Sequence, residues 1–399
     1  MRTSSIVAIV VAILVILGVV QVARPVAPPT VSTKAAGTHV IAGKRPSLPW
    51  PSGVQADAEV AGIGAWPQQG PSNPIPIGSI AKMMTAYAVL QAHPLSIGET
   101  GPTLTVTPAD VSLYQQDAST QQSVMYVTAN EKLSELLMLE GILVPSGNNI
   151  ATMLSDWVGG TTSRFTQAMN RDAKALGLTH TFYHGPVGLN AATVSTAADQ
   201  MKLAALMMKN PVIREIVNMP QLSVPGQSQL EYNYNKLVGH NGVIGIKTGS
   251  TIQAGGCVVL AKNITVNNST LTVYSSVIGA TASGNQLGVA LNDADAVLKA
   301  AGKAVGTHSV IAKGAIVGTI KAPWQSAVPL ITTKSATFMG WPGLQYSLKL
   351  TTHLPTSHTL AKGTTVGTLT ATLGSQTVNI PVKTASSLTK PSLHYRLTR

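Results

Sequence analysis

The sequence has few of the features that would assign it to a common binding class. It holds a single cysteine, Cys257 in the run GGCVVLA, so no disulfide can form within the chain. We expect that thiol to be packed in a buried strand. Aromatic residues make up 4% of the chain, and no run of four Lys or Arg occurs despite a net charge of +12. A protein that stacks bases needs more aromatic side chains, so we predict no nucleic-acid partner.

Carboxylates are absent from residues 303–399. Thr, Val, Gly and Ser dominate there, and AKGAIVGTI at Ala312 recurs as AKGTTVGTL at Ala361. Two copies suggest a small all-β domain of two similar halves, residues 303–388, followed by a basic tail, 389–399. Without acids this region is a poor place for acid–base chemistry, so we interpret it as a spacer or an interaction module.

The N-terminal part contains a long hydrophobic run. Every residue from Ile6 to Val20 is apolar or glycine, which indicates a signal anchor or a signal peptide over residues 1–23. Residues 24–52 are rich in proline and lack an apolar period, which predicts a linker.

The residues from 53 to 302 alternate between helical and strand-like patterns. Apolar spacing predicts helices over 79–92, 130–144, 163–177, 195–210 and 291–302. Thr196 is expected to cap its helix, with Asp199 completing an acidic form of the capping box. Three strand-like runs, 242–249, 255–263 and 269–280, predict an antiparallel meander. The expected fold class is α+β, with an antiparallel sheet flanked by helices and a helical subdomain.

Ser79 and Lys82 stand three residues apart at the head of one predicted helix. This spacing places both side chains on one helix face. The serine hydroxyl would lie beside the free N–H groups of the helix N-terminus. An apolar environment would lower the pKa of Lys82, so that its neutral amine could accept the serine proton.

Two further motifs contain residues suited to the same chemistry. Ser146-Gly147-Asn148 follows a Leu-rich helix; its hydroxyl can relay a proton and its amide can hold a substrate carbonyl. Lys247-Thr248-Gly249 ends a predicted strand, where a cation and a hydroxyl can meet an anionic group. Gly249 would allow substrate backbone to approach closely.

Each motif also occurs by chance, as Ser387 to Lys390 and Ser283 to Asn285 demonstrate. Both copies lie after Lys247 and therefore break the order of the set. Serine–lysine, Ser-x-Asn and Lys-Thr-Gly in this order, on a helix, a loop and a strand, form the motif set of the penicilloyl-serine transferases.

From residue 53 to 300 the chain resembles the serine-type D-alanyl-D-alanine carboxypeptidases, the low-molecular-mass penicillin-binding proteins. The segments PIGSIAKMMTAYAVL, LLMLEGILVPSGNN and NGVIGIKTGST follow that family's order. The resemblance implies a penicillin-binding, β-lactamase-like transpeptidase fold. It also implies hydrolysis of the terminal D-Ala-D-Ala bond of peptidoglycan stem peptides, with β-lactams as acylating inhibitors and without a metal or cofactor. The protein would be extracytoplasmic, anchored in the cell membrane or secreted to the wall.

The resemblance also implies roles for the matched residues. Ser79 would be the acylated nucleophile, Lys82 its base and Ser146 the proton relay. Asn148 would hold the peptide, and Lys247 with Thr248 would bind the terminal carboxylate. The backbone N–H groups of Ser79 and Ser250 would form the oxyanion hole.

Some residues depart from the family pattern. No arginine follows the third strand in VIGATASGNQ, where members often use one to bind the carboxylate. Members usually have Asn-Pro-His before Gly-Leu, whereas HGPVGL carries Pro186 and Val187 there. The segment AEVAGIGAWPQQGP departs from their common Asp-x-x-x-Gly hairpin.

Two other functions are compatible with parts of this pattern. A class A β-lactamase needs a glutamate after the second motif, but residues 150–213 hold only the acids Asp156, Asp172 and Asp199. A wall-binding or β-lactam-sensing protein with a retired site would not need all three motifs intact. His180 and His184 fall in a predicted loop without a third ligand nearby in sequence, so no metal site is assigned.

Overall fold

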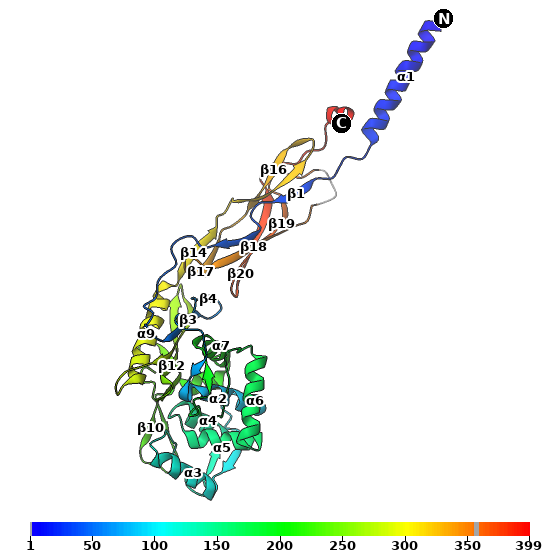
Figure 1. Cartoon of the computed structure of the whole chain (residues 1–399). Helices are drawn as coiled ribbons and strands as arrows, with labels where there is room; N and C mark the ends of the chain where they lie inside the picture. Colours follow the sequence, from blue (N-terminus) through cyan, green and yellow to red (C-terminus); the bar gives the residue numbers. More distant parts are fainter. Residues whose placement is uncertain (1, 355–358) are drawn as a thin grey trace. The chain divides into compact units, whose positions relative to one another are not determined.

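The protein folds as two compact units, seen here in a computed structural model that describes residues 2–354 and 359–399 (Figure 1). We call residues 47–305 the large unit. Residues 1–46 and 306–399 together form the β-rich unit.

The large unit is built on a five-stranded antiparallel sheet. Its strand order is β11 (Val243–Thr251), β12 (Gly255–Val266), β13 (Ser269–Ala280), β3 (Gln55–Val60) and β4 (Gly64–Ala65). The meander predicted from three strand-like runs is therefore confirmed, and the segment that departs from the family hairpin supplies the remaining two strands. Helix α9 (Gln286–Ala304) covers one side of this sheet, and the helical part lies on the other (Figure 1).

The helical part surrounds one buried segment. A 3₁₀ turn, η1 (Gly78–Ala81), continues into α2 (Lys82–Ala92), and most side chains of both are buried. The neighbouring helices are α3 (Pro108–Ser119), α4 (Glu135–Leu143), α5 (Asn148–Gly159), α6 (Thr162–Ala175), α7 (Ala197–Met207) and α8 (Pro211–Val217). Short strand pairs connect them: β5 (Ile75–Pro76) with β8 (Val194–Ser195), β6 (Thr103–Thr105) with β7 (Lys132–Ser134), and β9 (Gln221–Ser223) with β10 (Leu230–Tyr232). The predicted α+β fold class is confirmed.

Two local predictions differ from the structure. The helix expected over 130–144 begins only at Glu135, because Lys132–Ser134 pairs with β6 and the Ser134 hydroxyl caps α4 by accepting from the Leu137 N–H (3.2 Å). Thr196 does cap α7. The Asp199 carboxylate does not close the box, because it accepts from the His180 N–H (2.8 Å) and fixes the preceding loop.

The β-rich unit contains a seven-stranded sheet that takes strands from both ends of the chain. Its order is β1 (Thr30–Thr33), β15 (Ile316–Ala322), β16 (Gln325–Thr332), β20 (Gln376–Thr384), β19 (Thr365–Leu373), β18 (Gln345–Thr352) and β2 (Gly37–Val40). A separate pair joins β14 (Gly306–Ile311) to β17 (Ala336–Gly340). The segment predicted as a linker, 24–52, thus contributes both edge strands of the sheet, because its short Thr- and Val-containing runs pair with free strand edges.

Helix α1 (Arg2–Ala23) begins this unit. Its stretch Ser4–Ala23 has a mean hydropathy of 3.1, and it is long enough to cross a bilayer, as a signal sequence can also be. The last helix, α10 (Leu393–Thr398), contacts the end of α1, where the Arg396 guanidinium donates to the Val22 carbonyl (2.9 Å).

The repeated AKG segments form the same hydrogen-bonded turn twice. The Thr332 hydroxyl donates to the Ala312 carbonyl (2.7 Å) and accepts from the Ala315 N–H (3.0 Å). The Thr384 hydroxyl donates to the Ala361 carbonyl (2.8 Å) and accepts from the N–H of Thr364 (3.2 Å).

The two halves also meet symmetrically, where β16 pairs with β20. The Pro329 carbonyl accepts from the Ala385 N–H (2.9 Å), and the Pro381 carbonyl accepts from the Thr333 N–H (3.1 Å). The two similar halves expected from the sequence correspond to two hairpins, β15–β16 and β19–β20, which pair through equivalent hydrogen bonds.

We predict that Thr332→Val and Thr384→Val destabilise the β-rich unit by similar amounts, about 1 kcal/mol each, because each removes a buried hydroxyl that bonds a part-buried carbonyl and a part-buried N–H. Thermal or urea unfolding measures this. Thr337→Val, at an exposed strand position, is the control and should unfold like the wild type. Strongly unequal losses would contradict the equivalence of the two turns.

Candidate active site

Ser79 and Lys82 lie together at the junction of η1 and α2. The Lys82 Nζ is 3.0 Å from the Ser79 Oγ, as the three-residue spacing predicts. The same nitrogen donates to the Asn148 Oδ1 (2.7 Å) and to the Val187 carbonyl (3.2 Å). The serine hydroxyl is thus beside an amine whose position is fixed by two separate segments of the chain.

The amine of Lys82 is completely buried. Burial lowers its pKa well below the usual value for lysine, and the nearby Lys247 charge lowers that pKa further, while the Asp117 carboxylate acts in the opposite direction. A lysine in this environment favours its neutral form. That form is required if the amine is to accept a proton from the adjacent hydroxyl.

The second motif occupies the turn before α5. The Gly147 N–H donates to the Gly141 carbonyl (2.8 Å), and the Asn148 N–H donates to the Ser123 carbonyl (2.8 Å). Ser146 adopts a left-handed backbone conformation, with φ of 64°. Its buried hydroxyl has no hydrogen-bond partner in the described structure, so it is free to bind a ligand.

The third motif lies on β11, directly beside η1. A Cβ atom at Gly249 would stand 2.7 Å from the backbone nitrogen of Ser79 and 2.8 Å from that of Ile80. The sequence suggested that this glycine admits substrate backbone. The structure shows a different requirement, since the glycine lets the strand pack against the turn that carries the serine.

Lys247 is also buried, and burial lowers its pKa to about 7. Its amine donates to the Thr248 carbonyl (3.1 Å). Because Lys247 and Lys82 influence each other electrostatically, a second positive charge in this site is unfavourable unless an anion enters.

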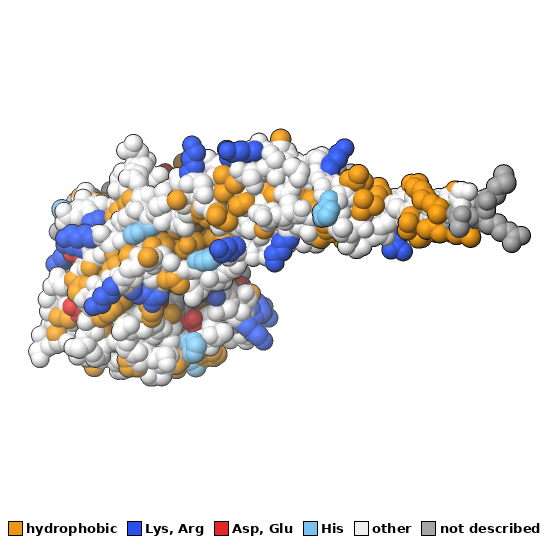
Figure 2. Space-filling view, turned by 90° about the horizontal axis from the view of Figure 1, so that it is seen from above, with side chains coloured by type: hydrophobic (Ala, Val, Ile, Leu, Met, Phe, Trp, Pro, Cys, Tyr) orange, Lys and Arg blue, Asp and Glu red, His pale blue; other side chains and the backbone are white. Residues whose placement is uncertain are grey.

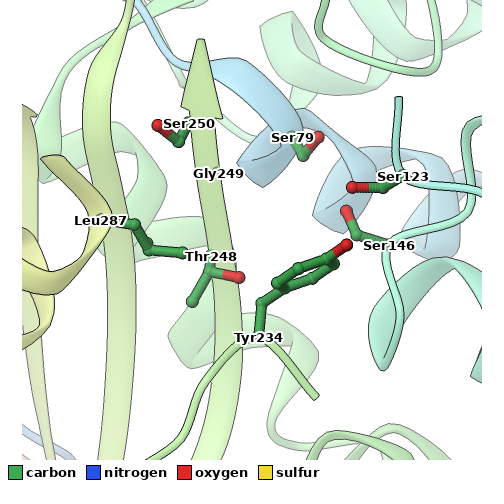
Figure 3. Close-up of a pocket in the computed structure, with 8 residues that line it drawn as sticks. All are labelled: Ser79, Ser123, Ser146, Tyr234, Thr248, Gly249, Ser250 and Leu287. Carbon is green, nitrogen blue, oxygen red and sulfur yellow. The ribbon is translucent and has the colours of Figure 1, made fainter. Parts of the chain in front are cut away.

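A cleft of about 120 Å³ connects the three motifs (Figure 3). It is lined by Ser79, Ser123, Ser146, Tyr234, Thr248, Gly249, Ser250 and Leu287. Figure 3 shows the hydroxyl of Tyr234 pointing toward Ser146. Ser146 lies across the cleft from β11. Lys82, Asn148 and Lys247 lie behind this surface, buried in the protein.

Sequence reasoning missed the residues that support Asn148 and Lys82. The Gln122 Oε1 accepts from the Asn148 Nδ2 (2.7 Å), which directs the Asn148 oxygen toward Lys82. Asp117, mostly buried on α3, is the acid that interacts with Lys82. Neither stands in a motif, and only the folded chain brings them to the site. No group of three His, Cys, Asp or Glu that could hold a metal ion occurs among the described residues.

The departure in HGPVGL has little effect on these contacts. The Pro186 carbonyl accepts from the Thr85 hydroxyl (2.7 Å), and the Val187 carbonyl accepts from Lys82. Because both contacts are made by backbone oxygens, the identity of those two side chains is not what holds α2 in place.

Comparison with known proteins agrees with this geometry. Residues 67–282 match the family model described as D-alanyl-D-alanine carboxypeptidase, a peptidase family. The match includes all three motifs and more than half of the chain. The chain belongs to this family. The resemblance noted from the motifs is thereby confirmed.

The relatives within the family differ in their named activities. A D-alanyl-D-alanine endopeptidase of Pseudomonas aeruginosa is 32% identical over 202 residues, which cover 49% of this chain and 61% of that protein. The carboxypeptidase DacF of Bacillus subtilis is 28% identical over 45% of this chain and 46% of its own length. The chain thus spans about half of the length of these curated relatives.

Solved structures share the fold. A Streptomyces DD-transpeptidase superposes with a TM-score of 0.54 at 26% identity, over 65% of this chain and 98% of that one. Penicillin binding protein 5 from Haemophilus influenzae superposes with a TM-score of 0.58 at 18% identity, over 88% of this chain and all of the other. The fold therefore agrees with that implied by the motifs.

We predict that Gly249→Ala destabilises the large unit by about 1–3 kcal/mol, because the added methyl group forces β11 away from the Ser79 nitrogen. Thermal unfolding measures the loss. Ser250→Ala, at the next and exposed position, is the control and should keep the wild-type melting temperature. Equal melting temperatures for Gly249→Ala and the wild type would contradict the packing requirement.

Proposed function

We propose that the protein is a serine DD-carboxypeptidase that removes the terminal D-alanine from peptidoglycan stem peptides through an acyl-serine intermediate. The observation that carries this proposal is the buried Lys82 amine, 3.0 Å from the Ser79 hydroxyl and held by Asn148. Membership of the family and the names of its relatives support the substrate class.

In the proposed reaction, neutral Lys82 takes the proton of the Ser79 hydroxyl as its oxygen attacks the carbonyl carbon between the two D-alanines. The negative charge that develops on the carbonyl oxygen is stabilised by the N–H groups of Ser79 and Ser250. Close packing at Gly249 supports this role, since it brings the two backbone segments together. The unpartnered Ser146 hydroxyl passes a proton to the amine of the leaving D-alanine.

Asn148 and β11 hold the substrate in this scheme. The amide of Asn148 binds the peptide backbone, and Lys247 with Thr248 binds the terminal carboxylate. A substrate carboxylate would neutralise the Lys247 ammonium and so favour its charged form. Water then attacks the acyl-serine and frees the shortened peptide and Ser79, with no cofactor. β-Lactams would acylate the same serine.

The proposed location is outside the cytoplasm, at the cell membrane or in the wall, where such peptides occur. The apolar helix α1 is compatible with either an anchor or an export signal. Neither α1 nor the β-rich unit contributes a residue to the proposed reaction, since all proposed site residues lie between Ser79 and Ser250.

An endopeptidase acting on cross-linked stem peptides is a second candidate. No arginine follows β13 to close the carboxylate end of the cleft. Beyond Ser250 a further hollow of about 280 Å³ is lined by Gly284, Asn285, Gln286 and Leu287, and Ser250 and Leu287 line both spaces. Extra room on this side would suit a leaving group larger than D-alanine. Comparing cleavage of a cross-linked peptide dimer with that of a pentapeptide separates the two activities.

We predict that the wild-type protein releases D-alanine from a stem pentapeptide and that Ser79→Ala abolishes release. Mass spectrometry of the peptide measures this, and a fluorescent penicillin should label the wild type but not the variant. Ser123→Ala, which lines the same cleft, is the matched control and should still be labelled. Equal release by wild type and Ser79→Ala would overturn the proposed mechanism.

The two buried lysines predict a bell-shaped pH profile for kcat/KM. The active form needs neutral Lys82 and charged Lys247. Burial and then the Lys247 charge lower the pKa of Lys82, and the proposed reaction requires Lys82 to lose its proton before Lys247 does. Activity should rise as Lys82 deprotonates and fall above about pH 7, where Lys247 loses its charge. In Lys247→Arg the loss of activity above about pH 7 should disappear, since arginine stays charged. If the variant loses activity over the same pH range as the wild type, the loss is not caused by deprotonation of Lys247.

A further inference from the structure

The charges of the chain are divided unequally between its two units. The β-rich unit carries fourteen Lys and Arg residues and no Asp or Glu, whereas the large unit carries thirteen Lys and Arg residues and all fifteen acids. Their formal charges of +14 and −2 add to the +12 of the chain. The positive charge therefore belongs to the unit that contributes nothing to the cleft.

The cations of the β-rich unit have no opposite charge within it. The ion pair found among the described residues, Lys299–Asp295, belongs to the large unit. Eleven of the thirteen cationic side chains whose exposure is described in this unit are exposed, and on the face shown in Figure 2 Lys and Arg are spread over the surface and not gathered in one patch. Like charges without counter-charges disfavour a compact fold. The repulsion between these cations is reduced if a binding partner supplies negative charge.

The cations of the β-rich unit occur at both ends of the sheet. Their separation decides whether a bilayer surface could be the partner that neutralises them. Exposed Lys321 lies by the turn between β15 and β16. This turn is near the end of α1, because the Trp324 indole donates to the Thr389 carbonyl (2.7 Å) just before α10. Arg45, bonded to the Gly343 carbonyl, and Lys349 lie toward the opposite end, by the turn joining β19 to β20. Nine strand residues span about 30 Å. At physiological salt a bilayer surface acts over about 8 Å, so it would not reach these cations.

We propose that the β-rich unit binds a flexible linear polyanion that carries repeated phosphate or carboxylate groups and lies along its strands. Such a chain can neutralise cations at both ends of the sheet at once, and it releases counterions as it does so. It would hold the Ser79 cleft close to substrates attached to the same polymer and raise their effective concentration. The binding itself does not depend on the proposed catalytic function.

The test uses the full chain in a detergent micelle and two variants with the same net charge. The first changes four exposed lysines of the β-rich unit: Lys34→Gln, Lys313→Gln, Lys334→Gln and Lys349→Gln. The control changes four exposed lysines of the large unit: Lys132→Gln, Lys174→Gln, Lys209→Gln and Lys303→Gln. Long-chain polyphosphate and polyglutamate are the probes, and their relative affinities distinguish the phosphate source from the carboxylate source.

We expect the first variant to bind the preferred probe at least about tenfold more weakly and with a shallower dependence on salt, because fewer counterions are released. The control should bind like the wild type. Both variants should release D-alanine from a short soluble peptide at the wild-type rate, which separates failure of this proposal from failure of the proposed catalysis. Circular dichroism verifies that both are folded.

Two results would overturn the proposal. Equal affinities of the two variants would mean that total charge, and not the β-rich unit, attracts the polyanion. Loss of polyanion binding when the wild type is placed in nanodiscs of anionic lipid, with binding retained in zwitterionic nanodiscs, would mean that these lysines face the bilayer.

Discussion

The hydrogen bonds of one buried amine organise the large unit. Lys82 lies within reach of the Ser79 hydroxyl, the Asn148 side chain and the Val187 carbonyl, which come from three separate segments of the chain. An unpaired polar nitrogen in a protein interior is costly, so each of these segments must be in place for the amine to be accommodated. The helical part therefore completes its packing and its candidate site together. Because the Lys82 amine needs all three partners, the candidate site can form only when these three segments have packed together.

Close backbone approach is the second constraint on the site. Gly249 brings β11 against the turn that carries Ser79. Gly188, with φ of 87°, brings the loop after α6 against the same turn, where a Cβ would stand 2.1 Å from the Gly78 carbonyl. A glycine in a functional motif is readily interpreted as space for a ligand. Here both glycines are needed by the protein itself, because they let strand and loop contact the residue that bears the nucleophile.

Features encoded by neighbouring residues could be predicted from the sequence, and features that depend on distant contacts could not. The three-residue spacing of Ser79 and Lys82 and the glycine-bounded strands of the meander are local patterns. By contrast, β1 has only four residues, and its partner β15 lies almost three hundred positions away, so no local signal distinguishes it from a linker. Gln122 was missed for the same reason, since its importance comes from one contact with Asn148 across the fold. The repeat at Ala312 and Ala361 was visible because a duplicated turn keeps its residues even where the strands around it diverge.

The two edge strands of the β-rich unit have a consequence for how the protein is made. Both lie within the first 46 residues, and the strands they pair with follow residue 306, so the large unit is an insertion within the β-rich unit. As the chain grows from its N-terminus, β1 and β2 must wait, unpaired, while some 270 residues are synthesised and the large unit folds. Their brevity and the prolines around them then become useful, because short, proline-flanked edges give neighbouring chains little to pair with during that interval.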